Sequence, residues 1–306
     1  MIQCISPIDG SIYVERPYAA AREIDASLAK AVKAAAEWRR VSVAERAKYC
    51  SAMVDAFVAK RAQHAGELAR QMGRPIRYGP GEVRGFEERA RCMIGFAAKA
   101  LADIELPEKS GFKRFIRRDP VGVLLTVAPW NYPYLTSVNS VIPALMAGNA
   151  VLLKHSHQTP LCAERYAEAG IDAGMPEGLL QFLHLSREQT SALIGRAEIG
   201  AVAFTGSVAG GVDIEKAAVG RFIPVGLELG GKDPAYVRSD ANIAHAIENL
   251  VDGSFFNTGQ SCCGIERIYV HEDMYSKFVD GAVALTKQYA LGDPLDEATT
   301  LGPMVR

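Results

Sequence analysis

The sequence lacks the long apolar segments and the leader that mark membrane and secreted proteins. No apolar run approaches the length of a membrane-spanning helix. Residues 1–10 show neither the basic start nor the apolar run of a signal peptide. The formal net charge is −1, which gives no electrostatic basis for binding nucleic acid or an anionic membrane. We therefore expect a soluble protein whose partners include neither nucleic acid nor membrane.

Cysteines at disulfide or metal-binding spacing are also absent. The six cysteines include no C-x-x-C pair and form no cluster with histidine at zinc-ligand spacing. We therefore expect free thiols, a cytoplasmic location and no metal site. With 306 residues, of which 49% are hydrophobic, the chain can form two globular domains.

The first third of the chain is predicted to be helical. Apolar residues recur at helical spacing over residues 24–40, 43–72 and 81–102. We interpret these helices as scaffold. The alternation of charged and apolar side chains near residues 112–119 then predicts an exposed ribbon.

From residue 121 onward, short apolar segments alternate with helical ones. Strands are predicted at residues 121–128, 150–154, 179–183, 200–205 and 222–227. Helices are predicted between them, at residues 135–146, 160–173, 187–193 and 208–219. This alternation indicates an α/β fold with a parallel sheet. A second α/β unit begins at Glu228, with helices at residues 243–256 and 274–289.

Two adjacent cysteines, Cys262 and Cys263, follow a Gly-Gln pair and precede a predicted strand at residues 267–271. A cysteine at such a junction is accessible, and its thiolate becomes reactive where nearby donors or positive charge lower its pKa. The two thiols are not expected to bond to each other, because disulfide geometry requires more widely spaced α-carbons. An inert thiol is the alternative interpretation.

Asn131 follows a predicted strand and Lys154 ends one, at the edge where α/β proteins bind ligands. The Asn131 amide can donate to a developing oxyanion, and Lys154 can bind a ribose hydroxyl or a phosphate. A turn asparagine and a solvated lysine are the alternatives. His155 and His157 have no third metal ligand nearby in the sequence, so we interpret them as ordinary polar residues of a loop.

Ser207 follows the predicted strand at residues 200–205 and the turn at Gly206. Its hydroxyl can cap a helix, and the adjacent glycines let the backbone approach a pyrophosphate. A capped structural helix is the alternative, since the segment is not G-x-G-x-x-G.

Glu228 ends an apolar strand and precedes two glycines. Apolar surroundings raise the pKa of a carboxyl group, as a general base near neutral pH requires. The alternative is an ion pair with Lys232 or Arg267. We favour the catalytic interpretation, because apolar strands rarely carry an acid without a use.

Taken in order, these segments resemble the NAD(P)-dependent aldehyde dehydrogenase superfamily. The matching motifs are Pro129-Trp-Asn-Tyr-Pro133, Lys154 with Gln158-Thr-Pro160, Phe204-Thr-Gly-Ser207, Glu228-Leu-Gly-Gly-Lys232 and Gly259-Gln-Ser-Cys262. The resemblance covers essentially the whole chain. It implies a Rossmann-like, parallel-sheet NAD(P)-binding domain at residues 1–227, with an oligomerisation ribbon near residues 112–119. The first part of an α/β catalytic domain would follow at residues 228–306.

The resemblance implies a role for each catalytic residue. Cys262 would attack the aldehyde, and the Asn131 amide and the Cys262 backbone N–H would hold the oxyanion of the thiohemiacetal. Hydride transfer to the nicotinamide would leave a thioester. Glu228 would then activate the water that releases the carboxylic acid.

The cofactor-binding residues follow from the same resemblance. They are Trp130, Lys154, His157, Gly206, Ser207, Leu229 and Gly230. His157 stands where NAD-preferring members often carry a glutamate, so the cofactor is predicted as NAD or NADP.

Substrate, assembly and competing functions are predicted as follows. Asn139 stands where succinate-semialdehyde members often carry an arginine, which argues against a dianionic semialdehyde. The chain ends at Arg306, so we expect a part of a longer protein that forms a homo-oligomer, dimer or tetramer, when complete. Glu228 argues against a CoA-acylating member. The remaining alternatives are a cofactor-independent thioesterase or esterase and an inactive truncated dinucleotide-binding fragment.

Overall fold

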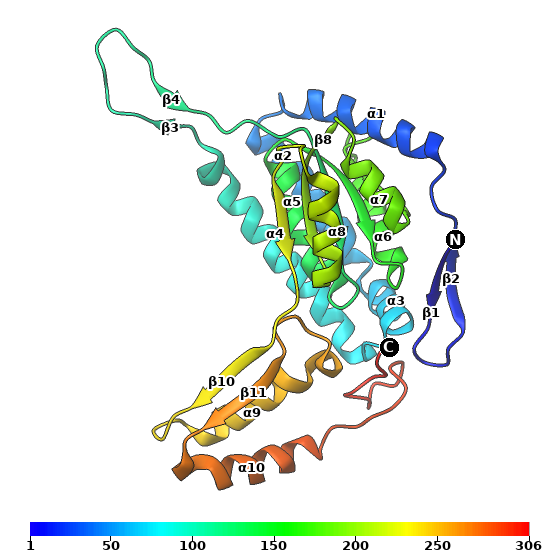
Figure 1. Cartoon of the computed structure of the whole chain (residues 1–306), viewed down its shortest axis with the longest axis vertical. Helices are drawn as coiled ribbons and strands as arrows, with labels where there is room; N and C mark the ends of the chain where they lie inside the picture. The colour runs from blue at the N-terminus through cyan, green and yellow to red at the C-terminus, as the bar shows by residue number, and fades with distance from the viewer. Residues whose placement is uncertain (306) are drawn as a thin grey trace.

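The computed structural model describes residues 1–305, and the expectation about the chain end at Arg306 lies outside these residues. Its centre is a parallel five-stranded sheet with the order β7-β6-β5-β8-β9 (Figure 1). The strands are β5 (Val123–Ala128), β6 (Ala150–His155), β7 (Leu180–Phe182), β8 (Ile199–Thr205) and β9 (Val225–Glu228). The α/β fold class predicted from the sequence is confirmed.

The strand order reverses beside β5. From β5 the chain moves outward through α5 (Pro133–Met146), β6, α6 (Pro160–Asp172) and β7. It then returns through α7 (Arg187–Ile194) to β8 on the other side of β5, and continues through α8 (Val208–Ala218) to β9. Right-handed crossovers in opposite directions place these helices on opposite faces of the sheet. The carboxyl ends of β5 and β8 therefore form a switch point, where open α/β sheets bind ligands.

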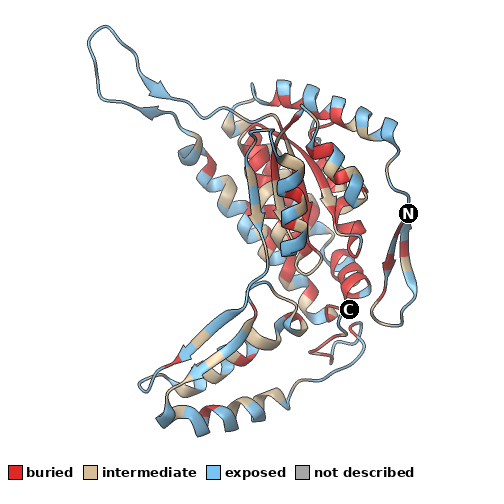
Figure 2. Ribbon diagram, viewed as in Figure 1, coloured by how far each residue is buried: buried red, intermediate tan, exposed pale blue. Residues whose placement is uncertain are grey.

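Burial on both faces explains the composition of the central strands. Val151, Leu152 and Leu153 of β6 are completely buried, as expected for a parallel strand covered by helices on both sides. Four N-terminal helices complete the layers: α1 (Ala21–Trp38), α2 (Val43–Ala59), α3 (Arg61–Met72) and α4 (Gly79–Leu101). Figure 2 shows the buried residues concentrated around this sheet.

A second, smaller unit follows β9. It consists of β10 (Asp233–Val237) paired in parallel with β11 (Ile265–Val270), together with α9 (Ile243–Phe255) and α10 (Glu272–Thr286). Its buried apolar side chains include Val237, Val251 and Phe278. The short helix η2 (Phe256–Gly259) leads from α9 toward the two adjacent cysteines.

Two antiparallel hairpins extend from the main body (Figure 1). One pairs β1 (Ile2–Ile5) with β2 (Ile12–Arg16). The other pairs β3 (Ile104–Glu105) with β4 (Phe115–Ile116), and residues 103–119 are exposed. The predicted ribbon near residues 112–119 is thus one arm of an exposed hairpin. Within residues 1–305, no helix is long and apolar enough to cross a membrane.

Several elements differ from the sequence-based predictions. The helix predicted over residues 43–72 is divided between α2 and α3 at Lys60, whose backbone leaves helical geometry without a Gly or Pro signal. The first helix begins at Ala21 rather than residue 24. Strand β10 was missed, because its Asp-Pro start is typical of a turn.

Candidate active site

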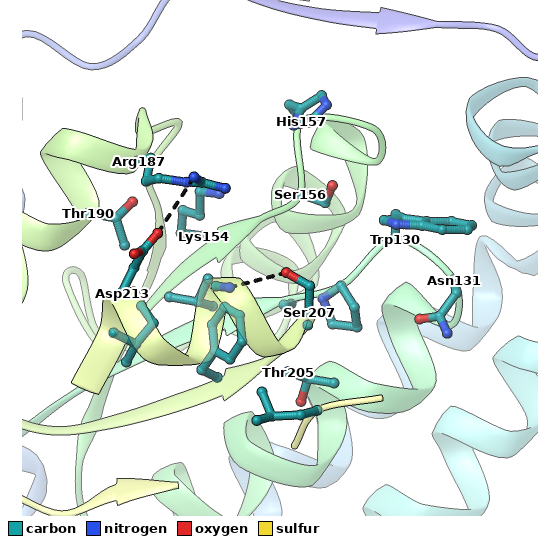
Figure 3. Close-up of a pocket in the computed structure, with 18 of the residues that line it drawn as sticks. Trp130, Asn131, Lys154, Ser156, His157, Arg187, Thr190, Thr205, Ser207 and Asp213 are labelled. Atoms are coloured by element: carbon teal, nitrogen blue, oxygen red, sulfur yellow. Dashed lines mark hydrogen bonds and ion pairs between the residues drawn. The ribbon is translucent and has the colours of Figure 1, made fainter. Parts of the chain in front are cut away.

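A cavity of about 870 Å³ opens at the carboxyl ends of β5, β6 and β8 (Figure 3). Trp130 and Asn131 reach it from the loop after β5, and Lys154 reaches it from the end of β6. The turn between β8 and α8 contributes Gly206 and Ser207. All the residues predicted to bind a cofactor line this cavity: Trp130, Lys154, His157, Gly206, Ser207, Leu229 and Gly230.

The turn before α8 has a backbone that a ligand can approach closely. The Ser207 hydroxyl accepts a hydrogen bond of 3.2 Å from the Gly210 N–H, which confirms the predicted helix cap. A Cβ at Gly206 or Gly210 would come within 2.6 or 2.7 Å of the Phe204 ring. These glycines therefore let the turn fold over Phe204 and leave the helix N-terminus facing the cavity.

The end of the cavity near β6 carries two cations (Figure 3). Burial is the main cause that lowers the pKa of Lys154 to about 8, and the charge of Arg187 lowers it further. Arg187 begins α7, and its guanidinium lies 3.5 Å from a carboxylate oxygen of Asp213. His157 lies exposed on the same rim. Arg187 was missed from the sequence, because an arginine after Ser186 reads only as the start of a helix.

A second cavity of about 740 Å³ adjoins the first. Cys262 lines both cavities, together with Ser261 and Phe204. Glu228 and Cys263 line only the second cavity. The predicted nucleophile and the predicted base thus face one space, while the predicted nucleotide-binding residues face the other.

The protonation of Cys262 differs from the sequence-based expectation. The nucleophile was expected to have donors or positive charge that lower its pKa. Instead, burial is the main cause that raises the pKa of Cys262, followed by the charge of Cys263 and a hydrogen bond with it. The side chain is nevertheless exposed to solvent, so the thiol is accessible.

The apolar surroundings predicted for Glu228 are not found. Glu228 is exposed at the end of β9, which is an edge strand of the sheet. The prediction failed because the sequence of β9 does not reveal that one side of the strand is unpaired. The proposed ion pair with Lys232 is not formed either, since Lys232 pairs with Glu266.

Asn131 has an oriented side-chain amide. Its Oδ1 accepts a hydrogen bond of 3.1 Å from the Tyr132 N–H, which directs the NH₂ end of the amide away from that contact. The Asn131 carbonyl accepts hydrogen bonds from Arg74 Nη2 at 2.6 Å and from Asn257 Nδ2 at 3.1 Å. These contacts fix the loop that carries the predicted oxyanion donor.

Asn257 joins this loop to the one that carries the nucleophile. Its Nδ2 also donates to the Gln260 carbonyl at 3.2 Å, and its Oδ1 accepts from Arg74 Nε at 3.1 Å. Asn257 has a positive φ of 55° and is buried. The sequence did not reveal this link, because Arg74 and Asn257 are 183 residues apart.

Buried Glu82 completes the network. It forms an ion pair with Arg74, and both side chains are shielded from solvent. Its Oε1 also accepts a hydrogen bond of 2.9 Å from the Tyr134 N–H at the start of α5. Breaking such a buried pair leaves an uncompensated charge, so the network holds its geometry strongly.

The His-x-His pair is divided between two environments. His155 is buried, and its Nε2 lies 2.9 Å from the Ser137 hydroxyl, whereas His157 is exposed. Within residues 1–305, no group of three His, Cys, Asp or Glu side chains is arranged to hold a metal ion.

The chain is similar to one protein-family model and to several named proteins. The model of the aldehyde dehydrogenase family matches residues 1–306. The chain is 36% identical to 3,6-anhydro-alpha-L-galactose dehydrogenase of Streptomyces coelicolor, over 98% of this chain and 61% of that protein. It is 34% identical to succinate-semialdehyde dehydrogenase [NADP(+)] 1 of Mycobacterium tuberculosis, over 99% of this chain and 67% of that protein.

A solved structure agrees with the fold. PnpE from Pseudomonas sp. WBC-3, in complex with nicotinamide adenine dinucleotide, superposes with a TM-score of 0.95 at 32% identity. The match covers 100% of this chain and 63% of that one. The chain thus spans between 61% and 67% of the length of these three proteins.

Proposed function

Because the chain belongs to the aldehyde dehydrogenase family, we propose that it oxidises an aldehyde to a carboxylic acid with NAD(P)⁺. The observation that carries this proposal is the position of Cys262 on the wall shared by two cavities. One cavity has the chemistry of a dinucleotide site, and the other brings Glu228 to the same cysteine. A thiol between a cofactor and a water-activating carboxylate suits this reaction better than cofactor-independent ester hydrolysis.

The residues of the first cavity fit a nicotinamide dinucleotide. The capped start of α8 presents backbone N–H groups suited to a pyrophosphate, and the position of Lys154 in the same cavity supports a contact with the adenosine ribose. Trp130 walls the site. When bound, the cofactor accepts the hydride that leaves the substrate.

Three residues perform the remaining chemistry in this proposal. The Cys262 thiol loses its proton to solvent, its sulfur bonds to the aldehyde carbon, and the Asn131 amide and the Cys262 N–H hold the oxyanion of the thiohemiacetal. Loss of the hydride leaves a thioester on Cys262. Glu228 accepts a proton from water, and the resulting attack breaks the C–S bond and releases the acid.

We further propose a preference for NADP over NAD. Arg187, Lys154 and His157 line the end of the cavity where an adenosine ribose would lie, and an arginine fork matches a 2′-phosphate. Replacement Arg187→Gln should weaken NADP binding about tenfold and leave NAD binding nearly unchanged. Equal losses for both cofactors, measured by calorimetry, would contradict this assignment.

Assembly, location and domain limits belong to the same proposal. The exposed hairpin around β3 and β4 supports a homo-oligomer, and the free cysteines support a reducing, cytoplasmic location. We retain the division into a cofactor domain at residues 1–227 and part of a catalytic domain at residues 228–306.

The proposal is tested by following NADPH formation from NADP⁺ with a panel of aldehydes. Turnover should be lost in the Cys262→Ala variant. Cys92→Ala is the matched control, because Cys92 is also exposed but lies on α4 and lines neither cavity. Turnover that survives in Cys262→Ala would refute the assigned nucleophile.

A further inference from the structure

We infer that Arg89 binds the carboxylate of an acidic aldehyde in the second cavity, an inference that rests on the proposed function. The cavity is lined by the sheet and by α5, from which the polar side chains of Thr136, Asn139 and Ser140 contribute. Arg89 reaches the cavity from α4 and contacts Asn139. Among the described residues that line this cavity, Arg89 is the only lysine or arginine.

Close packing of α4 and α5 directs Arg89 into the cavity. A Cβ at Gly85 would lie 3.1 Å from a methyl group of Leu135, so the two helices approach closely at this point. Arg89 is one turn further along α4, on the same face as Gly85. Its Nη1 donates a hydrogen bond of 3.1 Å to Asn139 Oδ1 across the interface.

The charge of Arg89 is uncompensated in this structure. Its partner Asn139 is neutral, and among residues 1–305 no carboxylate forms an ion pair with Arg89. Arg91 on the same helix, in contrast, pairs with Asp55 and Glu87. A guanidinium group has five N–H donors, so a carboxylate can bind to Arg89 in bidentate fashion while the Asn139 contact remains.

Arg89 and the predicted nucleophile reach the cavity from different elements. Arg89 comes from α4, and Cys262 follows η2. The cavity of about 740 Å³ has room for an aldehyde with a short carbon chain and a terminal carboxylate. Asn139 carries no charge, so the cation that would bind this carboxylate is supplied by α4.

The charge of Glu228 also favours binding of the substrate with its carboxylate at Arg89. Among the described residues lining the cavity, Glu228 is the only carboxylate, and Cys262 lines the same cavity. An acidic substrate would be repelled by Glu228 and attracted by Arg89. The aldehyde end is thereby directed to the cysteine and the carboxylate end to α4.

The first test compares kcat/KM for 4-oxobutanoate with kcat/KM for pentanal, a neutral aldehyde of similar size. The ratio should fall about ten- to a hundredfold in Arg89→Gln, because a charge-assisted contact is lost. Arg89→Lys should recover part of it. Arg84→Gln is the matched control, since Arg84 is also exposed on α4 but does not line the cavity. A ratio unchanged in Arg89→Gln would overturn the inference.

A second measurement needs no turnover. Glutarate, which carries carboxylates but no aldehyde, should slow the alkylation of Cys262 by iodoacetamide, as quantified by peptide mass spectrometry. The concentration for half-protection should rise about tenfold or more in Arg89→Gln but not in Arg84→Gln. If protection is lost only in Arg89→Gln and the protein oxidises no aldehyde, the anion site is supported and the proposed function is contradicted. Equal protection in both variants would overturn the anion site alone.

Discussion

Burial of Lys154 lowers its pKa to about 8, so its charge is lost within an accessible pH range. Below pH 8 the ammonium attracts phosphate oxygens, and above pH 8 it becomes neutral. We therefore predict that the Kd for NADP rises steadily between pH 8 and pH 9.5. The Kd, measured by calorimetry, should be higher and nearly independent of pH in Lys154→Met. The same pH dependence in both proteins would assign the titration to another group.

Cys263 provides a second prediction at the residue scale. Its charge and its hydrogen bond both raise the pKa of Cys262, after the larger contribution of burial. Replacement Cys263→Ala removes both effects, so the pKa of Cys262 should fall. The pH profile of Cys262 alkylation by iodoacetamide should then shift to lower pH. An unchanged profile would mean that burial alone sets this pKa.

At the scale of elements, the loop after β5 and the loop after η2 are coupled by Asn257. Its side-chain amide bonds to Arg74, to the Asn131 carbonyl and to the Gln260 carbonyl. Loss of these bonds should let the oxyanion donor and the nucleophile drift apart. We predict that Asn257→Gly lowers kcat about a hundredfold, with a much smaller effect on the KM for the aldehyde.

A matched replacement separates hydrogen bonding from backbone strain at this position. Asn257→Ala loses the same bonds, but alanine also resists the positive φ of 55°. Its unfolding free energy should be about 1 kcal/mol lower than that of Asn257→Gly, as measured by denaturant titration. Full activity in both variants would show that the network has no part in positioning the site.

The sequence predicted the elements well where local patterns decide them. The buried strands β5, β6 and β8 are apolar runs between turn signals, and Pro133 and Pro160 begin their helices at a favoured position. Local patterns do not show that β9 is an edge strand with one unpaired side, so the exposure of Glu228 was missed. They also do not show long-range contacts, so the buried Arg74–Glu82 pair went unrecognised.

The predicted site residues were identified from their positions along the chain relative to the strands. Asn131 and Ser207 each follow a strand and Lys154 lies near the end of one, and parallel strands bring their carboxyl ends to one edge of the sheet. Cys262 and Glu228 were singled out from their local sequence, but only the family resemblance gave them roles in one reaction, because the chain between them belongs to a different unit from the main sheet. Arg89 carries no sequence signal, since its role depends on the packing of α4 against α5.

At the scale of the whole molecule, the hairpin of β3 and β4 projects far from the body (Figure 1). It exposes large apolar side chains, with Phe112 at 64% and Ile116 at 51% relative exposure. Such side chains are typical of a surface that another subunit covers. We predict that the double replacement Phe112→Ser and Ile116→Ser reduces the molar mass in sedimentation equilibrium to that of one subunit. Phe96→Ser is the control, because Phe96 is 65% exposed on α4.

The central claim, that Cys262 carries the acyl group and Glu228 activates the water that removes it, is tested most directly in the Glu228→Gln variant. The protein should be mixed with NADP⁺ and pentanal and quenched at once. Mass spectrometry should then find a stable pentanoyl thioester on the peptide that contains Cys262, with one NADPH formed per active site. Normal steady-state turnover without an adduct, or an adduct on another residue, would contradict the account.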